Sequence, residues 1–218
     1  MSLKNLFGGF RRAPKEKSDE PPTPAPQSET RWVVAGLGNP GEEYSRSRHN
    51  AGFRVMDRIA KNKNVRFDRR KFKGEIAETE LAGVRALLVK PQTYYNGSGE
   101  CLSAILGYYK VPPSQLIVVH DELDLESGRL RLKRGGSDAG NRGVRSVEQS
   151  LSTPDFIRIR VGVSRPPGER ESKDYLLESM SPEARASLDA SIQRAAEAVE
   201  AIIAEGLDRA MGRFNQRA

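Results

Sequence analysis

A histidine and an aspartate in this sequence could work together in acid–base chemistry. Imidazole changes its charge near neutral pH, and a carboxylate that accepts its hydrogen bond fixes its tautomer and raises its basicity. We interpret His49 as the base and Asp121 as the carboxylate that orients it. Two asparagines, Asn39 and Asn96, occupy comparable places in the chain.

Each of these four side chains follows an apolar run that is typical of a buried strand. Three segments share this plan of a run rich in valine or leucine and then a polar loop. Polar residues beyond the carboxyl ends of neighbouring strands in an open α/β sheet converge on one crevice. We therefore expect the four side chains to face one another, and we interpret the first segment as one wall of a hydrolase active site. The segments are 32–52, 87–99 and 116–124.

Residues 36–41 also spell G-x-G-x-x-G after a strand, which is the fingerprint of dinucleotide-binding folds. Such a fold needs a helix that begins at the last glycine and a carboxylate that ends the second strand about 20 residues later. Pro40 and the polar loop delay the helix to about Asn50, a good N-cap, and Asp57 falls inside that helix. The pattern therefore favours a turn whose glycines adopt backbone conformations closed to other residues.

Two further residues could compete for a chemical role. His120 directly continues an apolar strand and is expected to face inward, so His49 is the favoured base. Cys101 begins a helix near the crevice, but no histidine is paired with it and a buried cysteine is commonly inert packing. With two histidines and one cysteine, neither a zinc site nor an internal disulfide is expected, and a reducing compartment is favoured.

The length of 218 residues suits one domain with a tail. Residues 1–30 are rich in proline, charged and poor in large apolar side chains, so we expect a disordered basic tail before a domain over 31–218. Residues 1–12 could instead be a transit peptide or a surface anchor, although two adjacent glycines disfavour a helix. No apolar run approaches the roughly 20 residues of a membrane span, so we expect a cytoplasmic protein, or an organellar one if the tail directs import.

Elements with clear periodicity predict a single-domain α/β fold with a mixed, twisted sheet flanked by helices. A basic loop is expected over 62–73, followed by a hairpin that turns at Ala82-Gly83. Ser181 and Pro182 mark the start of a long helix that ends near Gly206. The other expected elements are helices around 102–109 and 144–151, and a strand over 157–163.

The formal net charge is +7, of which residues 1–31 contribute +3 through six cations and three carboxylates. The remaining excess is concentrated between residues 129 and 165. Alternation in 129–133 places cations on one face of a strand and leucines on the other. A solvated sheet face and a surface for a phosphate backbone both fit this pattern. The clustered cations are Arg129, Arg131, Lys133, Arg134, Arg142, Arg145, Arg158, Arg160 and Arg165.

Four stretches together resemble the bacterial-type peptidyl-tRNA hydrolase family, in its order and spacing. They are Gly36-Leu37-Gly38-Asn39-Pro40-Gly41 with Tyr44 and Arg48-His49-Asn50-Ala51-Gly52, then residues 90–99, 120–128 and 156–163. The resemblance covers nearly everything from Trp32 onward. It implies hydrolysis of the ester that joins a peptide to the 3′ end of tRNA, by a monomer without metal or cofactor.

The resemblance also implies a role for each matching side chain. His49 would activate water as general base, and Asp121 would orient it. The substrate would be held by Asn39, Tyr44, Tyr95, Asn96, Asn141 and Arg142. The phosphates of the tRNA acceptor stem would meet Arg131, Lys133 and Arg160.

Two departures from the family pattern bear on these roles. Tyr95 stands where the family usually has methionine, which adds bulk and a hydroxyl at the pocket wall. Asn141 and Arg142 replace the histidine and asparagine of the family's Gly-His-Asn-Gly. We hypothesise that Asn141 keeps the positioning role, while Arg142, which can only donate, engages phosphate or the developing oxyanion. The second hypothesis is an RNA-binding relative of the same fold with little or no turnover.

Overall fold

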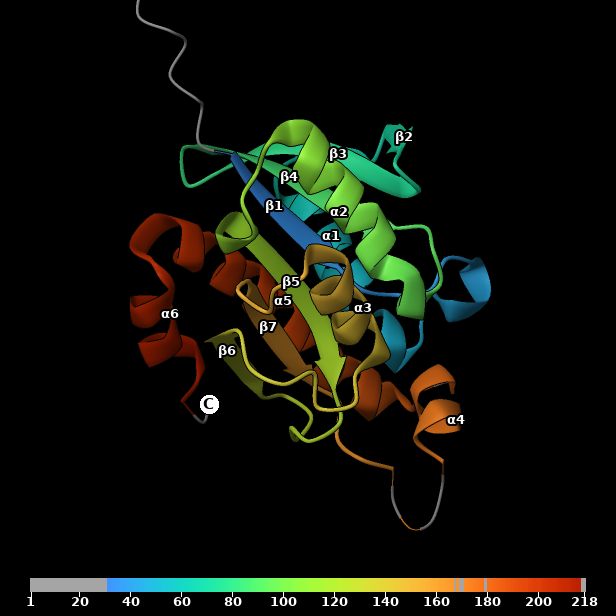
Figure 1. The fold of residues 1–218 in the computed structure, drawn as a ribbon. Helices are drawn as coiled ribbons and strands as arrows, with labels where there is room; N and C mark the ends of the chain where they lie inside the picture. Colours follow the sequence, from blue (N-terminus) through green and yellow to red (C-terminus); the bar gives the residue numbers. More distant parts are fainter. Residues whose placement is uncertain (1–30, 167, 169–170, 179, 217–218) are drawn as a thin grey trace, which may run out of the picture.

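The computed structural model describes residues 31–166, 168, 171–178 and 180–216, so the expected tail over 1–30 lies outside the described residues. The described chain forms one mixed seven-stranded sheet with the strand order β2-β3-β4-β1-β5-β7-β6 (Figure 1). The strands are β1 (Arg31–Gly36), β2 (Arg69–Lys71), β3 (Gly74–Leu81), β4 (Val84–Pro91), β5 (Leu116–Glu122), β6 (Leu130–Arg134) and β7 (Ile157–Gly162).

The centre of this sheet is parallel. β1 pairs in parallel with β4 and β5, and β5 pairs in parallel with β7. The outer strands β3 and β6 are antiparallel to their neighbours β4 and β7. The carboxyl ends of the four central strands therefore lie at one edge, which is where an open α/β sheet places its binding crevice. The predicted mixed sheet is confirmed.

Helices cover both faces of the sheet, as Figure 1 shows. Valines and leucines of the central strands are buried on both sides, which explains their continuous apolar runs. In β1, Val34 packs into one core while Val33 and Ala35 pack into the other. The first core lies under α1 (Ala51–Asn62), α5 (Pro182–Glu205) and α6 (Leu207–Phe214), and the second lies under α2 (Ser98–Tyr109) and α3 (Arg142–Leu151).

Short helices flank the strands, most of them at the carboxyl edge of the sheet. The helix α4 (Ser172–Leu177) lies beyond the strand ends (Figure 1). The 3-10 helices of the described residues are η1 (Glu42–Tyr44) and η2 (Arg48–Asn50) after β1, η3 (Tyr95–Gly97) after β4, and η4 (Pro113–Gln115) before β5. No helix in the described part of the chain is long and apolar enough to cross a membrane.

The predicted hairpin is present, but the loop predicted before it is only partly a loop. Ala82 (φ 49°) and Gly83 (φ 78°) both adopt the left-handed conformation that a two-residue type I′ turn requires, so the predicted turn is confirmed. The expected loop over 62–73 is wrong in its second half, where β2 pairs with β3. A charged pair between Arg70 and Glu75, 2.9 Å apart, replaces the apolar alternation by which a strand is usually predicted.

The glycine-rich turn after β1 forms as expected, but its glycines serve mainly for close packing. Only Gly41 has a left-handed backbone, with φ 116°. A Cβ on Gly36 would lie 2.1 Å from the carbonyl oxygen of Gly52, so Gly36 lets β1 end against the first turn of α1. This close approach fixes the segment that carries His49 at the end of the strand.

Candidate active site

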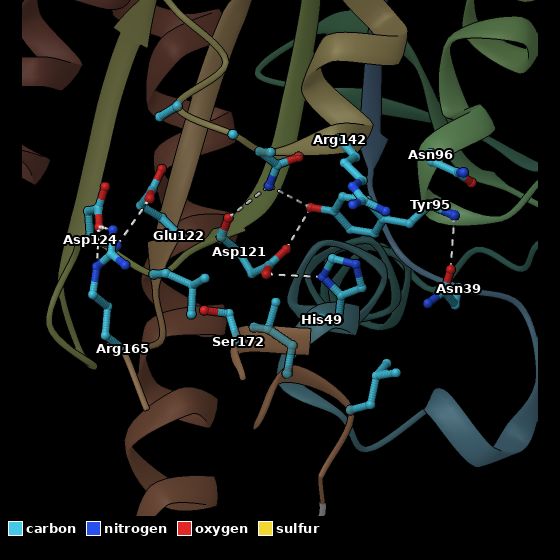
Figure 2. Close-up of a pocket in the computed structure, with 16 residues that line it drawn as sticks. Asn39, His49, Tyr95, Asn96, Asp121, Glu122, Asp124, Arg142, Arg165 and Ser172 are labelled. Atoms are coloured by element: carbon cyan, nitrogen blue, oxygen red, sulfur yellow. Dashed lines mark hydrogen bonds and ion pairs between the residues drawn. The ribbon is translucent and has the colours of Figure 1, made fainter. Parts of the chain in front are cut away.

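A cavity of about 470 Å³ opens at the carboxyl edge of the sheet (Figure 2). The loops after β1 and β4, the end of β5, the start of α3 and the helix α4 contribute its walls. Seven side chains from the sequence-derived set line it together, as the strand-loop pattern predicts. They are Asn39, His49, Tyr95, Asn96, Asp121, Asn141 and Arg142.

His49 and Asp121 are in direct contact. The Nδ1 atom of His49 lies 3.1 Å from Oδ2 of Asp121 (Figure 2). Because a carboxylate can only accept, Nδ1 carries the hydrogen and Nε2 is left with a lone pair. The carboxylate is 2% exposed, whereas the imidazole keeps 18% of its surface open. Burial alone would raise the pKa of Asp121, but His49 and the Tyr95 hydroxyl outweigh it and lower that pKa.

Tyr95 contacts both members of this pair. Its hydroxyl donates a 2.6 Å hydrogen bond to Oδ1 of Asp121, and its ring stacks on His49 with centroids 3.6 Å apart and planes 17° apart. Burial, with the nearby Asp121 charge, raises the pKa of Tyr95 well above its ordinary value, so the hydroxyl stays protonated as a donor. The hydroxyl thus points to Asp121.

Asn50 holds Asn39 in place at the cavity. Asn50 Oδ1 accepts from the backbone N of Asn39, and Asn50 Nδ2 donates to the carbonyl oxygen of Asn39, each at 2.9 Å. Asn50 occupies the N-cap position of α1, as expected, but its side chain does not cap the helix because both of its polar atoms bind Asn39. Asn39 Oδ1 accepts from the backbone N of Tyr95 at 2.9 Å, which leaves its Nδ2 hydrogens for a ligand.

Asn141 and Arg142 lie where α3 begins. Asn141 Oδ1 accepts from the backbone N of Val144 at 3.0 Å and so caps the helix, while its Nδ2 donates to the Tyr95 hydroxyl at 3.0 Å. Arg142 is exposed and makes no ion pair with any described residue. The guanidinium of Arg142 is therefore available to an anion that enters the cavity.

The competing residues lie outside the cavity lining. His120 is buried and faces inward, and its Nδ1 lies 2.7 Å from the carbonyl oxygen of Asp121. Burial lowers the pKa of His120, so this imidazole stays neutral. Cys101 lies on the buried face of α2, and burial raises its pKa to about 12, which is unsuited to a nucleophile. Among the described residues, no group of three or more histidine, cysteine, aspartate or glutamate side chains is arranged to hold a metal ion.

Of the residues expected to be catalytic or to hold the substrate in the pocket, Tyr44 alone does not line the cavity. Its carbonyl oxygen accepts from both the backbone N (2.9 Å) and the Oγ (2.8 Å) of Ser47. Tyr44 therefore shapes the turn that precedes His49.

Sequence reasoning missed the far wall of the cavity, which α4 and one ion pair provide. Arg165 binds Asp124 at 2.7 Å, and both line the cavity. The guanidinium of Arg48 lies 4.0 Å above the ring of Tyr175 and donates to its carbonyl oxygen at 3.1 Å, which ties α4 to the segment of His49. The run Tyr175-Leu176-Leu177 was the signal that the sequence offered for this wall. The lining residues on this side are Glu122, Leu123, Asp124, Arg165, Ser172, Leu176 and Leu177.

The three cations assigned to tRNA lie on adjoining strands beside the cavity. Arg131 on β6 is in register with Arg160 on β7, and both project from the sheet face opposite the buried Leu130 and Leu132. Arg160 forms a 2.8 Å ion pair with Glu122 of the cavity wall. Partial burial, and then the neighbouring arginines, lower the pKa of Lys133. The strand alternation expected over 129–133 is confirmed for its leucines.

The fold and the site together define an α/β protein with an imidazole–carboxylate pair suited to activating water. The chain belongs to the peptidyl-tRNA hydrolase family, because the sequence model of that family matches residues 33–218. The resemblance noted from the motifs is thereby confirmed.

Individual relatives agree with this assignment. A peptidyl-tRNA hydrolase of Frankia casuarinae is 45% identical over 190 residues, which cover 87% of this chain and 96% of the relative. One from Chloroflexus aggregans is 44% identical over 185 residues, covering 84% and 98%. The structure of peptidyl-tRNA hydrolase from Acinetobacter baumannii superposes with a TM-score of 0.80 at 29% identity, covering 88% of this chain and 97% of that one. The alternative of an RNA-binding relative without turnover is not favoured.

Proposed function

We propose that this protein hydrolyses the ester between the peptide and the 3′ ribose oxygen of peptidyl-tRNA, which releases the peptide and recycles the tRNA. Membership of the family supports the substrate. The observation that carries the chemistry is the 3.1 Å contact between His49 Nδ1 and Asp121 Oδ2 at the wall of the cavity.

In this proposal, His49 acts on water through its free nitrogen. Asp121 holds the Nδ1 hydrogen, and Nε2 removes a proton from a water molecule as its oxygen attacks the ester carbonyl carbon. The tetrahedral intermediate then collapses, the bond to the 3′ oxygen breaks, and that oxygen takes the proton from His49 Nε2, which forms the ribose hydroxyl and regenerates the base. A ribose alkoxide departs more readily than an amine, so the site needs little beyond a base and donors for the oxyanion.

Three side chains are proposed to contact the substrate in the cavity. Asn39 offers the amide hydrogens that its contact with Tyr95 leaves free. Asn96 is exposed at the same wall. Arg142 is proposed to stabilise negative charge, either on the oxyanion or on a terminal phosphate, because it lines the cavity without a carboxylate partner among the described residues.

The tRNA is proposed to bind across β6 and β7. Arg131 and Lys133 make no ion pair with a described residue, so their charges are available to acceptor-stem phosphates. Arg160 is already paired with Glu122, so it is proposed to link this surface to the cavity wall. Because one chain supplies the walls of the cavity, we infer that a monomer is sufficient for activity. We also propose that the protein acts in the cytoplasm, because translation produces peptidyl-tRNA there.

Release of the acyl group from N-acetyl-aminoacyl-tRNA tests the proposal. The His49→Ala variant should lose at least about 100-fold in rate, the usual lower range for a general base. Binding of the same tRNA, measured by filter retention, serves as the control and should stay within a few-fold of wild type. If the wild-type protein binds the tRNA but releases no more acyl group than His49→Ala, the proposed function is wrong.

A further inference from the structure

We propose that Tyr95 is a positioning residue for this reaction and that it acts together with Asn141 to hold Asp121, and through it His49, in one geometry. This proposal rests on the proposed function and deepens it. The sequence alone suggested that Tyr95 merely adds a hydroxyl to the pocket wall. The contacts of that hydroxyl indicate a different role.

The two carboxylate oxygens of Asp121 are held by different elements. Oδ2 accepts from His49 on η2 at 3.1 Å, and Oδ1 accepts from Tyr95 on η3 at 2.6 Å. With a single partner the carboxylate could rotate about its terminal bond, but two partners on opposite oxygens fix its plane. The ring of Tyr95 also stacks on His49, so one side chain restrains both members of the pair.

Tyr95 is itself fixed from three directions. Its backbone N donates to Asn39 Oδ1 at 2.9 Å, and its hydroxyl accepts from Asn141 Nδ2 at 3.0 Å. A Cβ on Gly143 would lie 2.4 Å from Cε1 of the Tyr95 ring, so glycine lets the first turn of α3 contact this ring. The hydrogen-bonded chain Asn141–Tyr95–Asp121–His49 therefore joins α3, η3, β5 and η2. Figure 2 shows its last three members.

The two departures from the family pattern, at Tyr95 and at Asn141, are thus joined by a hydrogen bond and act together. A methionine at position 95 could not donate to Asp121, whereas tyrosine can. Asn141, which replaces a histidine, supplies the donor that orients the tyrosine hydroxyl, and its other amide atom caps α3. Because both ends of the Asn141 amide are engaged, its role is to hold Tyr95.

The hydroxyl of Tyr95 shares the negative charge of Asp121 with His49. Without that hydroxyl, the carboxylate would interact more strongly with a protonated imidazole, so protonation of the base would persist to higher pH. The neighbouring charges do not change with Tyr95: Glu122 stays paired with Arg160, Asp124 with Arg165, and Arg142 lies at the start of α3. Buried His120 stays neutral.

Steady-state kinetics of Tyr95→Phe across pH test this proposal, with N-acetyl-aminoacyl-tRNA as substrate. We expect kcat to fall about tenfold with KM within about twofold, and the acidic limb of kcat/KM to move up by roughly half a pH unit. The matched control is Tyr94→Phe, because the adjacent Tyr94 is 69% exposed and does not line the cavity. This control should leave every parameter at the wild-type value.

Other outcomes overturn the proposal. A raised KM with unchanged kcat and pH profile would make Tyr95 a substrate contact, and a lowered Tm with unchanged kinetics would make it only structural. If wild type hydrolyses the substrate and Tyr95→Phe matches it, this inference alone fails; if wild type has no activity, the proposed function fails.

A double-mutant cycle tests the part assigned to Asn141. Asn141→Ser keeps an oxygen that can cap α3 but removes the donor to Tyr95. It should lower kcat several-fold in the wild-type background and add nothing in the Tyr95→Phe background. Losses that multiply in the double variant would contradict a shared hydrogen-bonded chain.

Discussion

Asp121 is the residue on which the hydrogen bonds of the site converge. Its side chain accepts from His49 and Tyr95, and its carbonyl oxygen lies 2.7 Å from Nδ1 of buried His120. A buried carboxylate is costly unless its oxygens have donors, and here both do. The same contacts that stabilise this charge also set the orientation of the base.

This arrangement makes stability depend on the protonation of Asp121. Its folded-state pKa is lowered from 3.8, so in acid the unfolded state binds more protons and protonation favours unfolding. The stabilisation is complete above about pH 4 and is lost as pH falls through the lower, folded-state pKa. Urea unfolding should give wild type and Asp121→Asn free energies of unfolding that differ by a constant amount at higher pH. Below about pH 4, the free energy of unfolding of wild type should fall relative to that of the variant. A difference that stays constant down to pH 2 would contradict it.

At the residue scale, the sequence predicted which side chains meet but not how they point. His49 and Asp121 could be paired because one follows β1 and the other lies near the carboxyl end of β5, its parallel neighbour. Side-chain rotamers and long-range contacts decide that the Tyr95 hydroxyl points to Asp121. They also decide that Asn50 binds the backbone of Asn39. Hydrophobic periodicity carries no information on either.

At the scale of elements, close helix packing positions the start of α3. Gly99 on α2 has its backbone N 3.0 Å from Ser146 Oγ on α3, and a Cβ there would lie 2.0 Å from the carbonyl oxygen of Ser146. Glycine therefore permits these helices to approach each other. The approach fixes the helix that Asn141 caps at the cavity.

Substituting this glycine should destabilise the fold. Gly99→Ala is expected to cost about 1–3 kcal/mol by overpacking against a backbone atom. The control is Gly107→Ala on the same helix, where an added Cβ meets nothing within 4 Å, so better helix propensity should stabilise by up to about 1 kcal/mol. Urea unfolding measures both, and equal effects at the two positions would count against the packing account.

The two helices at the end of the described chain differ in how far the sequence predicted them. The start of α5 could be predicted because Ser181 and Pro182 form a local signal, and Ser181 Oγ does accept from the backbone N of Ala184. In contrast, α6 was not among the expected helices, although Leu207, Ala210, Met211 and Phe214 recur at helical spacing and pack against the core. Asn215 fixes the position of α6 against β6. Its Oδ1 accepts from the backbone N of Leu132, 83 positions away, and its Nδ2 donates to the carbonyl oxygen of Leu132.

At the scale of the whole molecule, the helices leave part of one sheet face uncovered. The helices α2 and α3 pack over the β4-β1-β5 side of that face (Figure 1). On the same face, β7 and β6 carry cations. Carboxylates pair with two of these cations, Arg158 with Glu148 and Arg160 with Glu122. The surplus of positive charge therefore lies beside the cavity, where an acceptor stem would deliver its 3′ end.

Reversing the charge of this face should weaken tRNA binding. The double variant Arg131→Glu/Lys133→Glu is expected to bind tRNA at least about tenfold more weakly and to reduce the slope of log K against log salt by about 1.4–1.8, because each phosphate contact contributes about 0.7–0.9. Exposed Lys61 on α1, which packs on the opposite face, provides the control Lys61→Glu. An unchanged salt slope in the double variant would remove this face from the binding surface.

The central claim is that His49, held by Asp121, removes a proton from the attacking water. Single-turnover hydrolysis of N-acetyl-aminoacyl-tRNA by wild type, His49→Ala, Asp121→Asn and the double variant tests it most directly. Each single change should slow acyl release by about 10²–10⁴-fold, and the double variant should be no slower than His49→Ala, because Asp121 acts through the imidazole. A wild-type rate in His49→Ala, or losses that multiply in the double variant, would contradict the claim.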